Sequence, residues 1–220
     1  MRTITISVLI CFLFTSNAQG QVNDSSDVKQ ITYKPDLGNR KMILVSKQQL
    51  KAKPYYDKGY SYIGNNEFNK AIKPLKKAIK IDSTGNCGTG KNGMAYSELG
   101  YAFSRLNDIS NAFFYLDKTI EINKFVPEPY LSKSVILMKQ GKNDLALKEL
   151  DSCIKNNPEY ALVYVQRAFL FSSIKNYELA LQDYSMFLKV IKEQNQEQNS
   201  SALVEEVKKQ IKELEQKIKK

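Results

Sequence analysis

The sequence predicts an all-α protein: a right-handed α-solenoid of stacked antiparallel helix pairs with a C-terminal capping helix. One observation is a pattern of aromatic, leucine and alanine residues that recurs about every 34 residues, a period typical of helical-hairpin repeats. Another is that small residues of the pattern fall where two helices must approach closely, at Gly59, Gly100, Ser134 and Ala168. Because one hairpin cannot bury its own apolar face, neighbouring pairs must stack to form a core.

The repeats occupy most of the chain between residues 52 and 194. We assign four copies, at 52–85, 93–126, 127–160 and 161–194. The last two are the clearest, and their marker residues share offsets: Tyr130, Leu137, Gly141, Ala146, Leu150 and Cys153 correspond to Tyr164, Phe171, Lys175, Ala180, Tyr184 and Phe187.

The pattern resembles the tetratricopeptide repeat (TPR), whose first helix carries an aromatic–x2–Leu-Gly–x2–Tyr motif. The best match is the run Tyr-Ser-Glu-Leu-Gly-Tyr-Ala-Phe at 96–103, followed by Ala112 in the second helix. The chain departs from the family where Lys58, Lys133 and Arg167 replace a leucine. The resemblance implies a scaffold that binds proteins and is not an enzyme.

Composition narrows the possible functions further. The chain has 220 residues, no histidine and a formal net charge of +10. The absence of histidine removes the commonest general base and the commonest metal ligand. We therefore expect no enzyme activity, no metal and no cofactor. The basic charge favours acidic partners in general and does not inform the fold.

The N-terminus has the features of a secretory signal peptide at residues 1–18. Arg2 supplies the positive start, 4–14 the apolar run, and Ser-Asn-Ala at 16–18 a cleavage site. The run is shorter than the roughly 20 residues that span a membrane. We therefore predict an exported protein, periplasmic or secreted, with no transmembrane span. Export also argues against nucleic acid as a partner.

Residues 19–51 are predicted to form a flexible leader or an N-terminal cap. Met-Ile-Leu-Val at 42–45 is a short apolar run, and Ser46 with Gln49 resembles a capping box that begins a helix. The segment 41–53 either caps the first repeat or folds back into the groove as a strand-like arm. The sequence leaves both alternatives open.

A Gly-rich insertion at 86–92 separates the first two repeats. The stretch from Gly85 to Asn92 nearly matches the phosphate-binding loop G-x4-G-K-[ST]. Asn92 lacks the hydroxyl that would bind a metal ion, and the preceding segment 71–82 has helical rather than strand character. We therefore predict a flexible inter-repeat loop and no nucleotide site.

The C-terminal segment 201–220 is predicted to be one amphipathic helix. Its apolar residues recur at alternating spacings of three and four positions: Val204, Val207, Ile211, Leu214 and Ile218. A capping helix is the preferred interpretation, since terminal repeats need a polar outer face. The alternative is a coiled-coil helix that supports a weak homodimer.

The concave groove is the candidate site. In the family, one face of each first helix lines it, and the resemblance assigns that role here to Tyr56, Tyr60, Glu98, Tyr101, Arg105, Leu131, Val135, Met138, Val165 and Phe169. Aromatic residues and methionine are enriched where proteins bind proteins. We therefore expect a protein or peptide partner with exposed apolar side chains. Alternatively, these residues pack against neighbouring helices or a docked N-terminal arm.

One binding mode of the family is not expected here. Some members hold a terminal carboxylate with a Lys/Asn/Arg clamp, and the matching positions in this chain are Tyr56, Tyr60, Glu98, Glu128 and Ser132. These residues supply no positive charge. The leading hypothesis is an exported, non-catalytic scaffold that binds an apolar helix or extended segment. The alternative is an assembly or structural factor that self-associates through its C-terminal helix.

Overall fold

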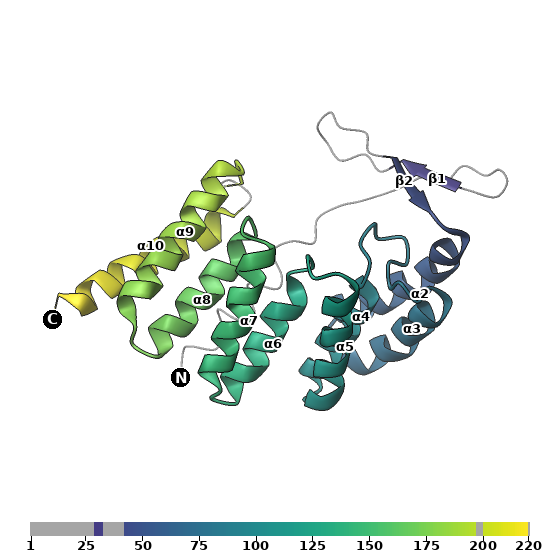
Figure 1. Ribbon diagram of the computed structural model, residues 1–220, viewed down its shortest axis with the longest axis horizontal. Helices are drawn as coiled ribbons and strands as arrows, with labels where there is room; N and C mark the ends of the chain where they lie inside the picture. Colours follow the sequence, from purple (N-terminus) through teal and green to yellow (C-terminus); the bar gives the residue numbers. More distant parts are fainter. Residues whose placement is uncertain (1–28, 33–41, 197–199, 220) are drawn as a thin grey trace. The chain divides into compact units, whose positions relative to one another are not determined.

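The computed structural model describes residues 29–32, 42–196 and 200–219. Within them the chain forms one pair of strands followed by nine helices in stacked pairs (Figure 1), so the predicted helical-repeat fold is confirmed. The strands are β1 (Lys29–Thr32) and β2 (Met42–Val45). The helices are α2 (Lys47–Gly64), α3 (Phe68–Ile81), α4 (Met94–Arg105), α5 (Ile109–Ile122), α6 (Glu128–Lys139), α7 (Asn143–Asn156), α8 (Ala161–Ser173), α9 (Tyr177–Glu193) and α10 (Ser201–Ile218).

The chain divides into two compact units, and the division falls within α6, after Ile136. We call them the N-terminal unit, which contains α2 to α5 and most of α6, and the C-terminal unit, which contains α7 to α10. The even-numbered helices α2, α4, α6 and α8 are the first helices of the repeats, and α3, α5, α7 and α9 are the second helices. The predicted signal peptide at 1–18 lies outside the described residues.

The segment before α2 is partly a strand. β2 pairs antiparallel with β1, with Met42 opposite Thr32, so the apolar run 42–45 belongs to a two-stranded sheet. The predicted capping box is confirmed: the Gln49 backbone N–H donates to Ser46 Oγ at 3.2 Å, and the Ser46 N–H donates to Gln49 Oε1 at 2.8 Å. These bonds satisfy N–H groups that lack helical partners. Helix α2 therefore begins at Lys47, ahead of the assigned repeat boundary.

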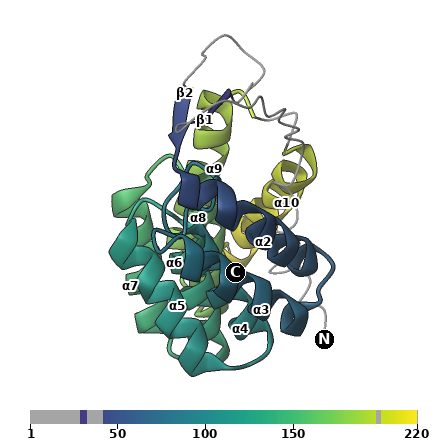
Figure 2. The same cartoon turned by 90° about the vertical axis from the view of Figure 1, so that its right-hand side faces the viewer.

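The N-terminal unit packs α2 against α3, α3 against α4, and α4 against α5 (Figures 1 and 2). Its core includes Leu75 and Leu116, both fully buried. The two glycines of the repeat pattern face these leucines. A Cβ atom on Gly59 would lie 2.5 Å from Leu75 Cγ, and one on Gly100 would lie 2.6 Å from Leu116 Cγ. Only glycine fits at these two positions, which confirms the predicted close approach of the helices.

The insertion after α3 is anchored by a buried carboxylate. Asp82 is 4% exposed and accepts hydrogen bonds from Thr84 Oγ1 at 2.6 Å, from the Thr84 N–H at 3.1 Å and from the Cys87 N–H at 2.7 Å. Cys87 itself is completely buried. Burial raises the pKa of its thiol to about 12, so the thiol stays neutral at physiological pH.

The rest of the insertion is also held by side chains. The Asn86 amide donates to Asn92 Oδ1 at 3.1 Å and accepts from the Gly90 N–H at 3.0 Å. Gly88 and Gly90 have positive φ values of 78° and 82°, which glycine adopts without strain. The insertion is thus a defined, hydrogen-bonded loop, in contrast to the flexible loop predicted. A phosphate-binding loop follows a strand, whereas this insertion follows the helix α3.

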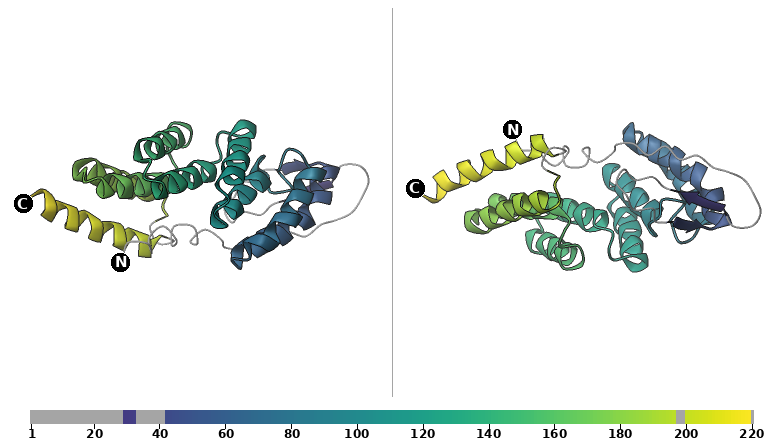
Figure 3. Two further views of the ribbon diagram at one scale, coloured as in Figure 1. Left: turned by 90° about the horizontal axis from the view of Figure 1, so that it is seen from below. Right: turned by 90° about the horizontal axis from the view of Figure 1, so that it is seen from above.

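The C-terminal unit packs α7 against α8, α8 against α9, and α9 against α10 (Figure 3). Phe187 of α9 is completely buried. On α10, Val204, Val207 and Leu214 are buried, whereas Ile218 at the end of the stripe is 41% exposed. Most of the predicted apolar stripe is therefore already covered within this unit, as a capping helix requires.

Two ion pairs recur at equivalent positions of successive repeats. Lys133 Nζ lies 2.8 Å from Asp117 Oδ1, and Arg167 Nη1 lies 2.6 Å from Asp151 Oδ1. Each joins the second helix of one repeat to the first helix of the next. Arg167 also binds the buried Asp183 through two bonds, of 2.8 and 2.7 Å. The basic residues that replace the family's leucine at these two positions are therefore partnered by acids on adjacent helices.

Candidate binding surface

The predicted groove residues come from the first helices, and they fall in both units. The N-terminal unit contributes Tyr56 and Tyr60 from α2, Glu98, Tyr101 and Arg105 from α4, and Leu131 and Val135 from α6. The C-terminal unit contributes Met138, Val165 and Phe169. We call the first set the N-terminal first-helix face.

Two tyrosines of α2 lie one helical turn apart and form a stack. The ring centroids of Tyr56 and Tyr60 are 5.9 Å apart, with 15° between the ring planes. Tyr56 is buried, whereas Tyr60 is 40% exposed. Burial raises the pKa of both phenols, and the nearby Glu98 carboxylate raises both further. Both hydroxyls are therefore neutral at physiological pH, and Tyr60 offers an aromatic surface to a partner.

A second aromatic cluster surrounds Arg105 at the end of α4. Its guanidinium lies 5.0 Å from the centre of the Phe68 ring and donates a 3.2 Å hydrogen bond to Tyr101 Oη. Phe68 and Tyr101 meet edge to face at 5.9 Å. Phe68 begins α3 and was not among the predicted groove residues, because its place follows from the packing of α3 on α4 and not from the first-helix pattern.

Glu98 and Glu128 are two acids that approach each other from α4 and α6. Desolvation raises the pKa of Glu98 to about 8, and the charge of Glu128 contributes to this shift. Within the described residues, no ion pair or hydrogen bond engages the Glu98 side chain. Among these residues, Glu128 Oε2 is buried and has no hydrogen-bond partner. The charge of Glu98 acts on Tyr56 and Tyr60, and the charge of Glu128 acts on Tyr60, so this part of the face is acidic and aromatic.

The predicted groove residues of the C-terminal unit are less exposed. Val165 is only 2% exposed, so its side chain packs inside the protein and is not offered to a partner. Phe169 and Met138 are half-buried. Met138 Sδ accepts a 3.5 Å hydrogen bond from Gln166 Nε2, a buried amide. The first-helix pattern placed these residues in the groove but did not separate core positions from exposed surface.

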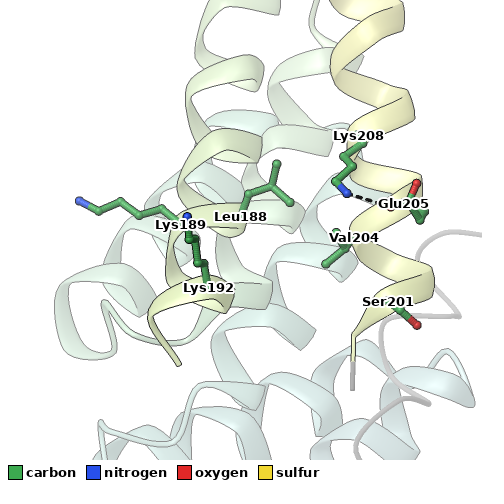
Figure 4. A pocket seen from close by; sticks show the side chains of 7 residues that line it. All are labelled: Leu188, Lys189, Lys192, Ser201, Val204, Glu205 and Lys208. Atoms are coloured by element: carbon green, nitrogen blue, oxygen red, sulfur yellow. Dashed lines mark hydrogen bonds and ion pairs between the residues drawn. The ribbon is translucent and has the colours of Figure 1, made fainter. Parts of the chain in front are cut away.

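A hollow of about 610 Å³ lies between α9 and α10 and was not predicted. Figure 4 shows Leu188 and Val204 directed toward this space, while Lys189 extends away from it. At its rim Lys208 forms a 2.8 Å ion pair with Glu205. The predicted stripe on α10 accounts for its apolar side, and the hollow contains none of the predicted groove residues.

Membrane spans and metal sites would each imply a different class of function. Among the residues that the structure describes, no helix is long and apolar enough to cross a membrane. Over the same residues, no cluster of cysteine, aspartate and glutamate has the arrangement to hold a metal ion.

Taken together, the stacked pairs define a helical-repeat protein with a TPR-like fold. Residues 52–84, nearly the whole of the first repeat, match the tetratricopeptide repeat family model. Repeats of this kind typically serve as scaffolds for protein–protein interaction and are generally non-catalytic. No curated protein has significant sequence similarity to the chain.

Several solved structures share this fold. MamA is 21% identical over 68% of this chain and 86% of its own, with a TM-score of 0.53. A thermophilic TPR protein of Thermus thermophilus is 15% identical over 72% of this chain and 91% of its own, with a TM-score of 0.54. A TPR protein of Parabacteroides merdae is 17% identical, covers 74% of this chain and 63% of its own, and has a TM-score of 0.53. At these identities the likeness concerns the fold alone.

Proposed function

We propose that this protein is an exported, non-catalytic scaffold that binds an apolar segment of a partner protein on the N-terminal first-helix face. The observation that carries the proposal is the exposure of Tyr60, which is 40% accessible on a face built by three consecutive first helices. Half-buried apolar side chains from α4 and α6, Tyr101, Leu131 and Val135, accompany it. Exposed aromatic surface beside apolar side chains is typical of a binding site.

Export is the part of this proposal that rests on the sequence alone. The charged start, the apolar run and the small-x-small motif at residues 1–18 support it. N-terminal sequencing of the protein recovered from its native cells tests it. We expect the mature chain to begin at Gln19, and a chain that still begins at Met1 would contradict cleavage.

Self-association through α10 is the weaker of the two alternatives. Val204, Val207 and Leu214 are buried against the rest of the protein. A dimer formed through this stripe would have to compete with the packing of α10 on α9. Nothing else on the described part of α10 favours a second copy as its partner.

Replacing two residues of the face should weaken partner binding. We expect the variant Tyr101→Ala, Val135→Lys to hold a native partner at least about 10-fold more weakly than wild type, because it loses an aromatic contact and places a charge in an apolar interface. Affinity capture from a native extract, followed by titration of the purified partner, measures the change. Both proteins should begin at Gln19.

The matched control is Phe125→Lys, which adds the same charge at an exposed aromatic residue in the loop between α5 and α6, outside the first helices; Phe125 is 62% exposed. Circular dichroism should first show that both variants are folded. A partner retained by wild type and Phe125→Lys but lost by the double variant supports the proposal. Equal retention by all three proteins contradicts it.

A further inference from the structure

We propose that Tyr56, Tyr60, Glu98 and Glu128 form a pocket for one cationic side chain, a lysine or arginine, of the bound segment. This inference rests on the proposed function and specifies the chemistry of the partner. It assigns a charge to a segment that the sequence predicts only to be apolar. We call these four residues the acidic pocket.

The four side chains come from three first helices. Tyr56 and Tyr60 stack on α2, Glu98 belongs to α4 and Glu128 to α6. The charge of Glu98 acts on both tyrosines, and the charge of Glu128 acts on Tyr60 and on Glu98. Glu98 therefore lies within electrostatic range of both tyrosines, and Glu128 lies within range of Tyr60 and Glu98. Asp57 and Cys87 also act on Tyr56.

The pocket lacks a cation of its own among the described residues. The nearest basic member of the face, Arg105, is directed to the rings of Phe68 and Tyr101. Glu128 Oε2 is buried and has no hydrogen-bond partner in the part of the chain that the structure describes, which is costly for a carboxylate. A fold tolerates such a group mainly where function requires it. A ligand cation would supply the missing partner for both acids.

The aromatic rings suit the same ligand. A lysine or arginine over a tyrosine face is attracted by the negative face of the ring, and the attraction increases when the site is desolvated. Tyr60 provides an exposed ring beside the two carboxylates. The net charge of +10 on the whole chain disfavours a strongly basic partner, so a single cation within an apolar segment fits best.

The pocket also reverses the polarity of the family's carboxylate clamp. At the positions that match the clamp's positive and amide groups, this chain has Tyr56, Tyr60, Glu98, Glu128 and Ser132. The ligand would therefore contribute the positive charge, and the protein the negative one. The protein would therefore recognise a side-chain cation and not a terminal carboxylate.

Binding should release a proton. The pKa of Glu98 is raised to about 8 in the free protein, so this carboxyl is mostly protonated at pH 7. A cation favours the ionised form and lowers that pKa, so the ligand and the proton compete. Affinity should therefore rise as the pH increases from 6 to about 8, the region in which free Glu98 titrates.

The test uses two blocked peptides, acetyl-Ala-Leu-Lys-Leu-Ala-amide and the same peptide with acetyl-lysine. Blocking both ends removes terminal charges, so any difference reports the side chain. Titrations followed by NMR chemical shifts should give a dissociation constant at least about 10-fold lower for the lysine peptide, as expected for a desolvated charge contact. The shifts should fall on α2, α4 and α6.

The variant Glu98→Gln, Glu128→Gln should remove this preference and the pH dependence. The amide has the shape of the protonated carboxyl, so the fold should be retained. Glu121→Gln is the matched control, since Glu121 is an exposed acid on α5 that pairs with Lys118, and it should change neither quantity.

Three outcomes would overturn the pocket. These are equal affinity for both peptides, no effect of the double glutamine variant, or no binding of the lysine peptide by wild type. If both peptides bind equally and Tyr101→Ala, Val135→Lys weakens both, the apolar face is supported while the acidic pocket is excluded. If Tyr101→Ala, Val135→Lys leaves the affinity for both peptides unchanged while the glutamine variant lowers it for the lysine peptide, the apolar contact of the proposed function is contradicted instead.

Discussion

Replacing Arg167 with methionine is expected to lower the free energy of unfolding of the protein by about 3–5 kcal/mol. Arg167 makes bonds of 2.8 and 2.7 Å to Asp183 and one of 2.6 Å to Asp151. The Asp183 side chain is only 7% exposed. Methionine fills a similar volume but leaves that carboxylate buried and unpaired, which is the main cost.

Urea unfolding followed by circular dichroism measures this loss. The matched control is Lys189→Met, which removes an ion pair whose atoms are 3.9 Å apart and whose side chains are both 64% exposed. It should change stability by less than about 0.5 kcal/mol. Adding Asp183→Leu to Arg167→Met should recover part of the loss, because the orphaned charge is then gone. A loss no larger than that of the control would show that the network contributes little.

Replacing Asp82 with alanine is expected to lower the free energy of unfolding by about 2–4 kcal/mol. The carboxylate accepts three hydrogen bonds, and its removal leaves the Cys87 N–H without its 2.7 Å partner in a buried position. Asp82→Asn keeps the shape and part of the acceptor capacity, so its effect should be intermediate. Urea unfolding again gives the magnitude.

The Cys87 thiol provides a local readout for the same change. It is completely buried in wild type, so it should react slowly with a thiol reagent, and Asp82→Ala should accelerate the reaction. Peptide mapping distinguishes Cys87 from Cys153. The control is Lys91→Ala at an exposed position of the same loop, which should alter stability by less than about 0.5 kcal/mol. An unchanged reaction rate in Asp82→Ala would show that the carboxylate does not hold the loop.

The sequence predicted what depends on local, periodic patterns. The helix pairs follow from the recurring spacing of apolar residues, the start of α2 from Ser46 and Gln49, and the packing of α10 from its apolar stripe. Each of these signals lies within a few residues of the structure that it specifies. The close approaches at Gly59 and Gly100 also follow from the repeat pattern. In each case the glycine faces a leucine of the paired helix in the same repeat.

Features that depend on distant partners were not predicted. The order of the insertion depends on Asp82, which precedes it and bonds to backbone N–H groups inside it. The pairing of β2 required knowledge of β1, which carries no strong strand pattern. In the candidate site, the pattern did not distinguish Tyr60, which is exposed, from Val165, which is buried. That distinction depends on how neighbouring helices cover each position.

The recurring ion pairs make successive repeats of this chain compatible with one another. Asp117 meets Lys133 at one joint, and Asp151 meets Arg167 at the next. In both, the acid belongs to the earlier repeat and the base to the later one. A tandem duplication of 127–160 would therefore present a lysine to Asp151 and an aspartate to Arg167. Internal repeats could therefore be added one at a time, and each new contact between repeats would still pair an acid with a base.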